Sequence, residues 1–235
     1  MIFICGCGHS GTTILNKIMG NHKNIHSINQ ETGLFAQHTK YTDEEIIKSL
    51  GALDQRIEFN KKWLCEKTPG HVYGIHRIFK LIKSPKIIVI IRDGRDVVAS
   101  LHKRYNDFDK SVDRWVEDNN TWLNNQYKDS FHLLKYEDLV KEPQIELKKI
   151  CDYLPEEYDT NMLNYKKEKV EPSIFHDIID GINHTSLRNY QINQELYDGT
   201  KRHLKDLTEV QMNLLYSNDR FMELMNSFGY LNVPK

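Results

Sequence analysis

The sequence predicts an α/β fold in which helices flank both faces of a central parallel sheet. The clearest sign is the continuous apolar run at residues 86–91, which is typical of a strand buried on both faces of such a sheet. A second is the apolar segment 2–5, which leads through a glycine-rich turn into a helical pattern at 14–19. Because strands alternate with helices along the chain, we expect the strands to be parallel.

The remaining elements follow the same alternation. Between the first two strands we expect two helices, at about 43–50 and 71–82. After the strand at 86–91 the pattern predicts, in order, helices at 97–101 and 111–127, a strand at 131–135, and helices at 137–141 and 143–153. The C-terminal part after Leu207 is expected to be helical, with Thr208 and Ser217 as N-caps. Residues 158–199 are polar and weakly periodic, which favours a long loop with one short helix.

Size and composition indicate one globular domain spanning residues 1–235. Hydrophobic residues make up 39% of the chain and charged residues 28%, which excludes collagen-like, membrane-spanning and wholly disordered classes. Lys and Arg number 32 against 33 Asp and Glu, so no global charge favours nucleic acid or an anionic membrane as a partner. Any anion site must therefore be local, and the oligomeric state stays open.

The cysteines and the N-terminal segment bear on location. Four cysteines are too few for a disulfide scaffold, so we expect free, buried thiols. The apolar opening is only about five residues long and has no basic residues before it, which does not fit a signal peptide or a membrane anchor. A cytoplasmic location is the expectation.

The turn at residues 6–13 has the chemistry of a phosphate or sulfate cradle. Glycines let its backbone approach a ligand, and the helix that follows adds positive partial charge at its N-terminus. Its glycines and Thr13 match the P-loop template GxxxxGK[ST], but Thr12 stands where that template has lysine. This difference argues against ATP or GTP chemistry. A tight turn without a ligand is the alternative.

Three separated segments resemble the sulfotransferases that use 3′-phosphoadenosine 5′-phosphosulfate. Residues 8–13, Gly-His-Ser-Gly-Thr-Thr, are similar to the family's phosphosulfate loop. Residues 90–100 look like its 3′-phosphate motif, in which a strand ends in Arg-Asp-x-Arg and a helix carries Ser. Residues 136–140 with Pro143 resemble a further landmark, and 67–69 read Lys-Thr-Pro. The resemblance is nearest to the Golgi-type, tyrosylprotein and bacterial members, and it implies a P-loop-like fold.

The resemblance implies a set of donor-binding residues. They are Gly8, His9, Ser10, Gly11, Thr12, Thr13, Arg92, Ser100, Ser186 and Arg188, with Lys201 and Arg202 as further basic candidates near the 3′-phosphate. Arg92 ends a buried strand, where ligands bind in open α/β sheets, and a guanidinium can hold a phosphate through two hydrogen bonds. The alternative is that Arg92 and Arg95 form structural ion pairs with Asp93 and Asp96.

Two residues are candidates for catalysis. Glu31 lies where related Golgi-type enzymes carry a glutamate, and it is the candidate base for the acceptor hydroxyl. Lys67, by resemblance to the family's catalytic lysine, would stabilise charge on the bridging oxygen. Cytosolic members use a histidine two residues after that lysine, but Pro69 stands there, so His71 is only a second candidate base. The chemistry needs no metal.

His9 departs from the family pattern, because it replaces the Lys or Arg of the phosphosulfate loop. An imidazole is mostly neutral at pH 7, but anion contact would raise its pKa. We expect His9 to act as a cation when the donor is bound, so that donor affinity falls as pH rises.

The sequence thus predicts a sulfotransferase that transfers a sulfuryl group to a hydroxyl-bearing acceptor, which is a carbohydrate, a tyrosine or a small molecule. A P-loop kinase, with Asp93 or Asp96 on Mg²⁺, is one alternative. A noncatalytic module that binds the phosphonucleotide is another.

Overall fold

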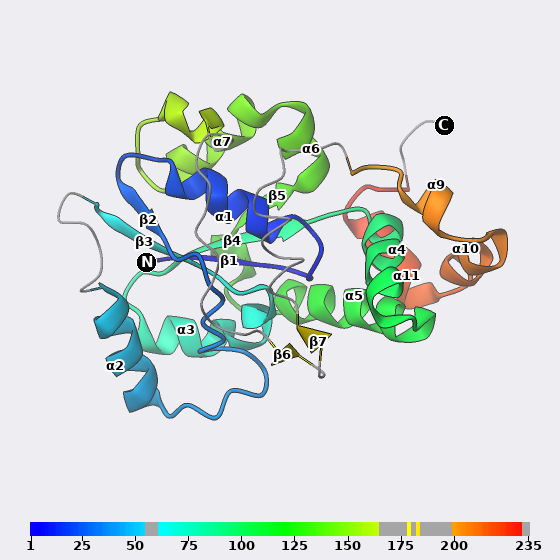
Figure 1. The fold of residues 1–235 in the computed structure, drawn as a ribbon, viewed down its shortest axis with the longest axis horizontal. Coiled ribbons are helices and arrows are strands. Elements are labelled where there is room, and N and C mark those ends of the chain that lie inside the picture. Colours follow the sequence, from blue (N-terminus) through cyan, green and yellow to red (C-terminus); the bar gives the residue numbers. More distant parts are fainter. Residues whose placement is uncertain (55–60, 165–177, 180–181, 184–198, 232–235) are drawn as a thin grey trace.

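The computed structural model describes residues 1–54, 61–164, 178–179, 182–183 and 199–231. Its centre is a five-stranded parallel sheet of order β2-β3-β1-β4-β5 (Figure 1). The strands are β1 (Ile2–Cys5), β2 (Ile25–Ser27), β3 (Trp63–Lys67), β4 (Lys86–Ile91) and β5 (His132–Lys135). The predicted α/β fold with a central parallel sheet is therefore confirmed.

Helices cover both faces of this sheet (Figure 1). One face carries α1 (Thr12–Gly20), α6 (Tyr136–Lys141) and α7 (Pro143–Tyr153). The other carries α2 (Asp43–Asp54), α3 (Ile75–Leu81), α4 (Gly94–Tyr105) and α5 (Phe108–Leu123). Side chains of a strand alternate between faces, so β1 gives Ile2 and Ile4 to one core and Phe3 and Cys5 to the other. This two-sided burial explains why β1 and β4 are apolar throughout.

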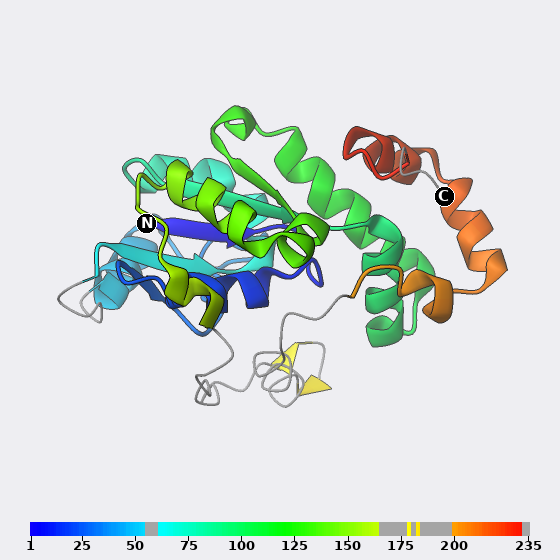
Figure 2. The same ribbon diagram turned by 90° about the horizontal axis from the view of Figure 1, so that it is seen from above.

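Three C-terminal helices lie beside α4 and α5, away from the N-terminus (Figure 2). They are α9 (His203–Asp206), α10 (Glu209–Tyr216) and α11 (Asp219–Ser227). The predicted cap of α10 is confirmed, since the Thr208 side chain accepts a hydrogen bond from the Gln211 amide. The predicted cap at Ser217 is wrong: Asn218 caps α11, and the Ser217 hydroxyl instead donates to the carbonyl of Asn213.

Other predicted elements differ in detail. The helix expected at 71–82 is a 3₁₀ turn, η1 (Pro69–Gly74), followed by α3, and α5 is shifted toward the N-terminus of its predicted range. Short strands β2 and β3 were not predicted. Two further 3₁₀ turns are η2 (Lys128–Ser130) and η3 (Thr160–Asn164), and β6 (Ile178–Ile179) pairs antiparallel with β7 (Ile182–Asn183).

All four cysteines are free and buried, as predicted. In the described part of the chain, no helix is both long and apolar enough to span a lipid bilayer.

Candidate functional site

The carboxyl ends of the strands bring the predicted site residues to one edge of the sheet. The order β2-β3-β1-β4-β5 sets the sequence of groups along that edge. Glu31 follows β2, Lys67 ends β3, the glycine-rich turn follows β1, and Arg92 follows β4. Ligands of open α/β sheets bind at this edge.

The turn at residues 6–13 leads directly from β1 into α1. Gly6 and Gly11 have φ values of 141° and 99°, which side chains rarely allow. A Cβ at Gly6 would also overlap the carbonyl of Ile90, and one at Gly11 would meet the Tyr136 ring. The Ser10 hydroxyl is buried and has no hydrogen-bond partner among the described residues. With the open amides of the first turn of α1, it forms a set of donors suited to an anion.

Arg92 is buried beside this turn, with 4% of its surface exposed. Its Nη1 donates to the carbonyl of His9 at 3.0 Å, and its Nη2 donates to the carbonyl of Gly199 at 2.5 Å. Its guanidinium also lies 4.5 Å from the centre of the Tyr136 ring. The Nε atom has no hydrogen-bond partner in the described ranges. The carbonyl contacts fix this guanidinium beside the turn, and its remaining N–H donors can hold an anion.

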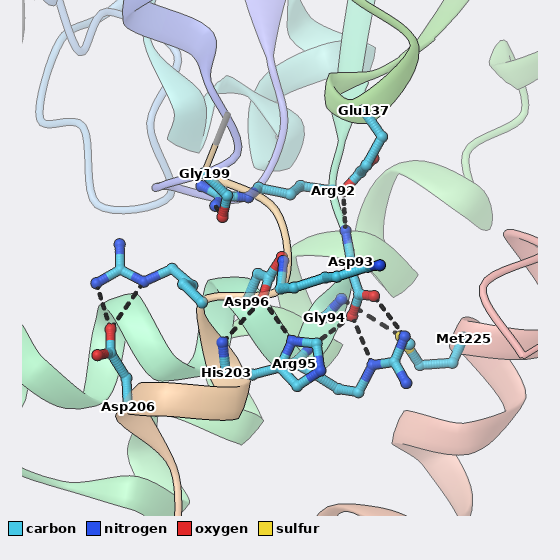
Figure 3. A network of polar contacts seen from close by, with 12 residues as sticks. Arg92, Asp93, Gly94, Arg95, Asp96, Glu137, Gly199, His203, Asp206 and Met225 are labelled. Atoms are coloured by element: carbon cyan, nitrogen blue, oxygen red, sulfur yellow. Dashed lines mark hydrogen bonds and ion pairs between the residues drawn. The ribbon is translucent and has the colours of Figure 1, made fainter. Parts of the chain in front are cut away.

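The two neighbouring aspartates serve structural roles (Figure 3). Asp93 caps α4 and pairs with Arg95 at 2.5 Å. Asp96 accepts hydrogen bonds from the amides of Lys201 and His203 and lies 2.5 Å from His203 Nδ1. Burial alone would raise the pKa of Asp96, but the His203 contacts hold it below its usual range. The predicted ion pairing is therefore confirmed for Asp93 with Arg95, while Arg92 stays outside it.

Asp96 also fixes the position of the chain after Gly199. Because it holds Lys201 and His203, it places Arg202 against α4, where its Nη1 donates to the Ser100 hydroxyl at 3.3 Å. The side chain of Lys201 is exposed. Ser186 and Arg188 lie outside the described residues.

His9 lies among arginines. Its Nδ1 is 2.7 Å from the Ser100 hydroxyl, and its Nε2 is 3.3 Å from Nη1 of Arg104. Burial first, and then the charges of Arg104, Arg202 and Arg92, lower the pKa of His9 to about 3. His9 is therefore neutral in the free protein, where its neighbours already carry the positive charge, and a cationic His9 in the donor complex stays a prediction.

Arg104 is the residue that sequence reasoning missed. It lies four positions after Ser100 on α4 and so shares a helix face with it. This four-residue spacing from Ser100 is the sequence feature that could have indicated Arg104. It was hidden because α4 extends to Tyr105, beyond the predicted end at residue 101.

The structure brings the two predicted catalytic residues together. Lys67 Nζ donates to Glu31 Oε1 at 2.7 Å. The Lys67 side chain is almost fully buried, whereas that of Glu31 is 21% exposed. A carboxylate and an ammonium in contact at a strand edge can serve as base and electrophile in one reaction.

His71, the second candidate base, is excluded by its surroundings. Its ring is fully buried, its Nε2 accepts from the Phe35 amide at 3.2 Å, and its Nδ1 lies 2.9 Å from Glu66. Glu66 also accepts from the Thr32 amide and from the hydroxyl of Thr68. Burial alone would raise the pKa of Glu66, but these contacts, His71 first, hold it below its usual range. Both nitrogens of His71 are thus engaged within the fold.

In the described ranges, no three or more His, Cys, Asp or Glu side chains are grouped so that they could hold a metal ion.

The low pKa of His9 predicts a pH-dependent stability. An unfolded imidazole gains a proton near pH 6.5, but His9 in the folded protein gains one only near pH 3, so the unfolded state binds more protons between these values. Stability then falls as pH falls through this window. Between pH 7 and pH 5, we expect wild type to lose about 2 kcal/mol more than His9→Asn, because Asn tolerates the left-handed backbone and does not titrate. Urea unfolding at both pH values measures this, and equal losses would contradict it.

Comparison with known proteins bears on the family and the fold. The sequence model of a family described as "Sulfotransferase family" matches residues 2–160. A Caenorhabditis briggsae protein named "Putative protein-tyrosine sulfotransferase" is 25% identical over 199 residues, which cover 70% of this chain and 69% of that protein.

Among solved structures, the fold is similar to the sulfotransferase domain of the Synechococcus PCC 7002 olefin synthase. The TM-score is 0.69 at 17% identity, over 93% of this chain and 94% of that domain. Mouse sulfotransferase SULT7A1, solved in complex with PAP, gives 0.58 at 16% identity, over 95% of this chain and 83% of that one.

Proposed function

This chain belongs to the sulfotransferase family, and from that premise we propose that it transfers the sulfuryl group of 3′-phosphoadenosine 5′-phosphosulfate to a hydroxyl group. The observation that carries the proposal is the buried guanidinium of Arg92 beside the glycine-rich turn. It contacts carbonyls, its Nε has no partner in the described part of the chain, and it adjoins a loop of anion donors. The structure of a related enzyme with PAP supports the choice of donor.

Different residues would bind the two ends of the donor. The amides of residues 8–13 and the Ser10 hydroxyl would hold the 5′-phosphosulfate. Arg92 and the Ser100 hydroxyl would hold the 3′-phosphate. Thr12 in place of a P-loop lysine suits this division, because the sulfuryl group carries less charge than a γ-phosphate.

Glu31 and Lys67 would carry out the chemistry. Glu31 accepts the proton of the acceptor hydroxyl as that oxygen bonds to sulfur, and the bond from sulfur to the bridging oxygen breaks. The charge that develops on the bridging oxygen is stabilised by Lys67. In the free protein the two side chains neutralise each other, so donor binding would draw Lys67 toward the bridging oxygen and release the carboxylate.

The kinase alternative loses support, because Asp93 and Asp96 are committed to Arg95 and His203. A transfer assay distinguishes the enzyme from the noncatalytic module. The purified enzyme should transfer labelled sulfate from the donor to an acceptor. Binding of adenosine 3′,5′-bisphosphate without transfer to any acceptor would favour the noncatalytic module. Tyrosine peptides are the first acceptors to test, since the Caenorhabditis briggsae relative is named for protein tyrosine.

The single-domain organisation of residues 1–235 and a cytoplasmic location remain predictions.

Replacing Arg92 by Ala should weaken binding of adenosine 3′,5′-bisphosphate by about 1.5–3 kcal/mol, the usual worth of a hydrogen bond to a charged group. Adenosine 5′-phosphate should bind wild type poorly and be nearly indifferent to the change. Calorimetry with both nucleotides measures this. Arg95→Ala is the matched control, since Arg95 pairs with Asp93. Equal losses for both nucleotides would show that Arg92 serves the fold rather than the 3′-phosphate.

A further inference from the structure

The segment that carries Glu31 has no regular secondary structure, yet hydrogen bonds fix its backbone. Residues 28–42 lie between β2 and α2, outside any helix or strand. Four consecutive amides of this segment, those of residues 32–35, each donate to a side chain. These amides begin one residue after the candidate base, so the groups that hold them also limit where Glu31 can lie.

The side chains that accept these amides converge on one buried carboxylate. Glu66 is fully buried. Its Oε1 accepts from the Thr32 amide at 3.1 Å, the Thr32 hydroxyl at 3.0 Å and the Thr68 hydroxyl at 2.5 Å. Its Oε2 lies 2.9 Å from His71 Nδ1. Glu66 therefore joins residues that are adjacent in sequence to both proposed catalytic groups.

The charge of Glu66 sets the direction of these hydrogen bonds. Although burial alone would raise the pKa of Glu66, its contacts hold that pKa below the usual range, so the carboxylate is ionised at neutral pH. An ionised carboxylate only accepts, so the hydroxyls of Thr32 and Thr68 each give their one proton to it. Their oxygens can then accept the amides of Leu34 at 3.4 Å and of Gly33 at 3.3 Å.

His71 connects Glu66 to the last of the four amides. A backbone amide only donates, so His71 Nε2 must accept from Phe35 at 3.2 Å. The proton of the neutral ring is then on Nδ1, which faces Glu66. The rings of His71 and Phe35 also pack edge to face, with centroids 5.4 Å apart. All four amides thus depend on Glu66, directly or through one intervening side chain.

We propose that Glu66 is a positioning residue whose buried carboxylate holds the Glu31 segment so that the base contacts Lys67. It acts through the two threonines and the histidine that it orients. The proposal rests on the proposed function, because the group that is positioned is the base for sulfuryl transfer. A misplacement of about 1 Å can cost about 100-fold in rate, so a network that touches no substrate can still control turnover.

The test removes the link nearest to Glu31. Thr32→Val keeps the branched shape but removes the hydroxyl, and with it a contact to Glu66 and the acceptor for the Leu34 amide. We expect kcat to fall about 10- to 100-fold, while KM for the donor and the affinity for adenosine 3′,5′-bisphosphate stay within about twofold. Thr32→Ser retains the hydroxyl and should keep most of kcat. Thr39→Val is the matched control in the same segment, because the Thr39 hydroxyl accepts from the Tyr41 amide, and it should leave kcat within about twofold.

Glu66→Gln tests the carboxylate itself. An amide that keeps its oxygen toward the threonines presents its NH₂ group to His71 Nδ1, donor against donor. His71 would then have to move its proton to Nε2 and give up the contact with Phe35. We expect kcat to fall at least about 10-fold although the size of the side chain is unchanged. The two Thr32 variants decide the question if Glu66→Gln does not fold.

A background without the base separates positioning from a general loss of structure. In Glu31→Gln no carboxylate is left to position, so adding Thr32→Val or Glu66→Gln should lower the remaining kcat less than about twofold. Equal losses in both backgrounds, or wild-type kcat in folded Thr32→Val, would overturn the positioning role alone. If wild type transfers no sulfuryl group, or Glu31→Gln keeps wild-type kcat, the proposed function itself fails and the inference with it.

Discussion

Replacing Glu31 by Gln should lower kcat for sulfuryl transfer by about 10²–10⁴-fold, the usual contribution of a positioned general base. Gln keeps the size of the side chain and can still accept a hydrogen bond from Lys67, which contacts Glu31 Oε1 at 2.7 Å in wild type. It cannot take the proton of the acceptor hydroxyl. The loss should appear in kcat, because the carboxylate contributes to the transition state rather than to donor binding.

The control for this variant is the donor site itself. Glu31→Gln should be stabilised by adenosine 3′,5′-bisphosphate to the same extent as wild type, since Arg92 and the glycine-rich turn are unchanged. The matched comparison is Gln30→Glu with Glu31→Gln, which moves the carboxylate one position along the chain and should not restore activity. Near-normal turnover by the folded Glu31→Gln protein would remove Glu31 as the base.

Lys67→Met should lower kcat by about 10²–10³-fold, as the loss of a preorganised donor to a developing negative charge does in other enzymes. Met replaces most of the aliphatic length of Lys67, whose side chain is 6% exposed, so packing at the end of β3 is largely kept. Steady-state kinetics with labelled donor measures the effect. Lys62→Met, on the exposed side chain before β3, is the matched control and should retain activity.

The two catalytic variants also test each other. Residues that act in one step give losses that do not add, so the double variant should be only slightly slower than the slower single variant. Losses that multiply fully would indicate that Glu31 and Lys67 act in separate steps, despite their contact.

The sequence predicted the elements that are buried on two faces. β1 and β4 have the bounds expected from their apolar runs, since each strand supplies both cores. β2 and β3 were missed for physical reasons. β2 has three residues, and β3 ends in Glu66 and Lys67, whose charges resemble an exposed loop but are buried in contact with His71 and Glu31. The hydrophobicity pattern cannot predict that a charged residue is buried when its partner is distant in the sequence.

The surroundings of the predicted site residues also depend on contacts between segments that are distant in the sequence. Glu31 and Lys67 meet because Glu31 follows β2 and Lys67 ends β3, and these two strands are neighbours in the parallel sheet. The pKa of His9 depends on Arg104 and Arg202, which lie 95 and 193 positions after it in the chain. His71 was only the second candidate base, and its ring nitrogens contact Phe35 and Glu66.

The order of strands also separates the residues proposed for catalysis from those proposed to bind the 3′-phosphate. Glu31 and Lys67 lie on the β2 and β3 side of the central strand β1, whereas Arg92, Ser100 and Arg202 lie on the β4 side. The segments that follow β2 can therefore change in sequence without altering the residues on the β4 side that are proposed to bind the nucleotide. If the proposed roles are right, a chimera that exchanges only residues 28–62 with a relative should change acceptor preference and keep the affinity for adenosine 3′,5′-bisphosphate.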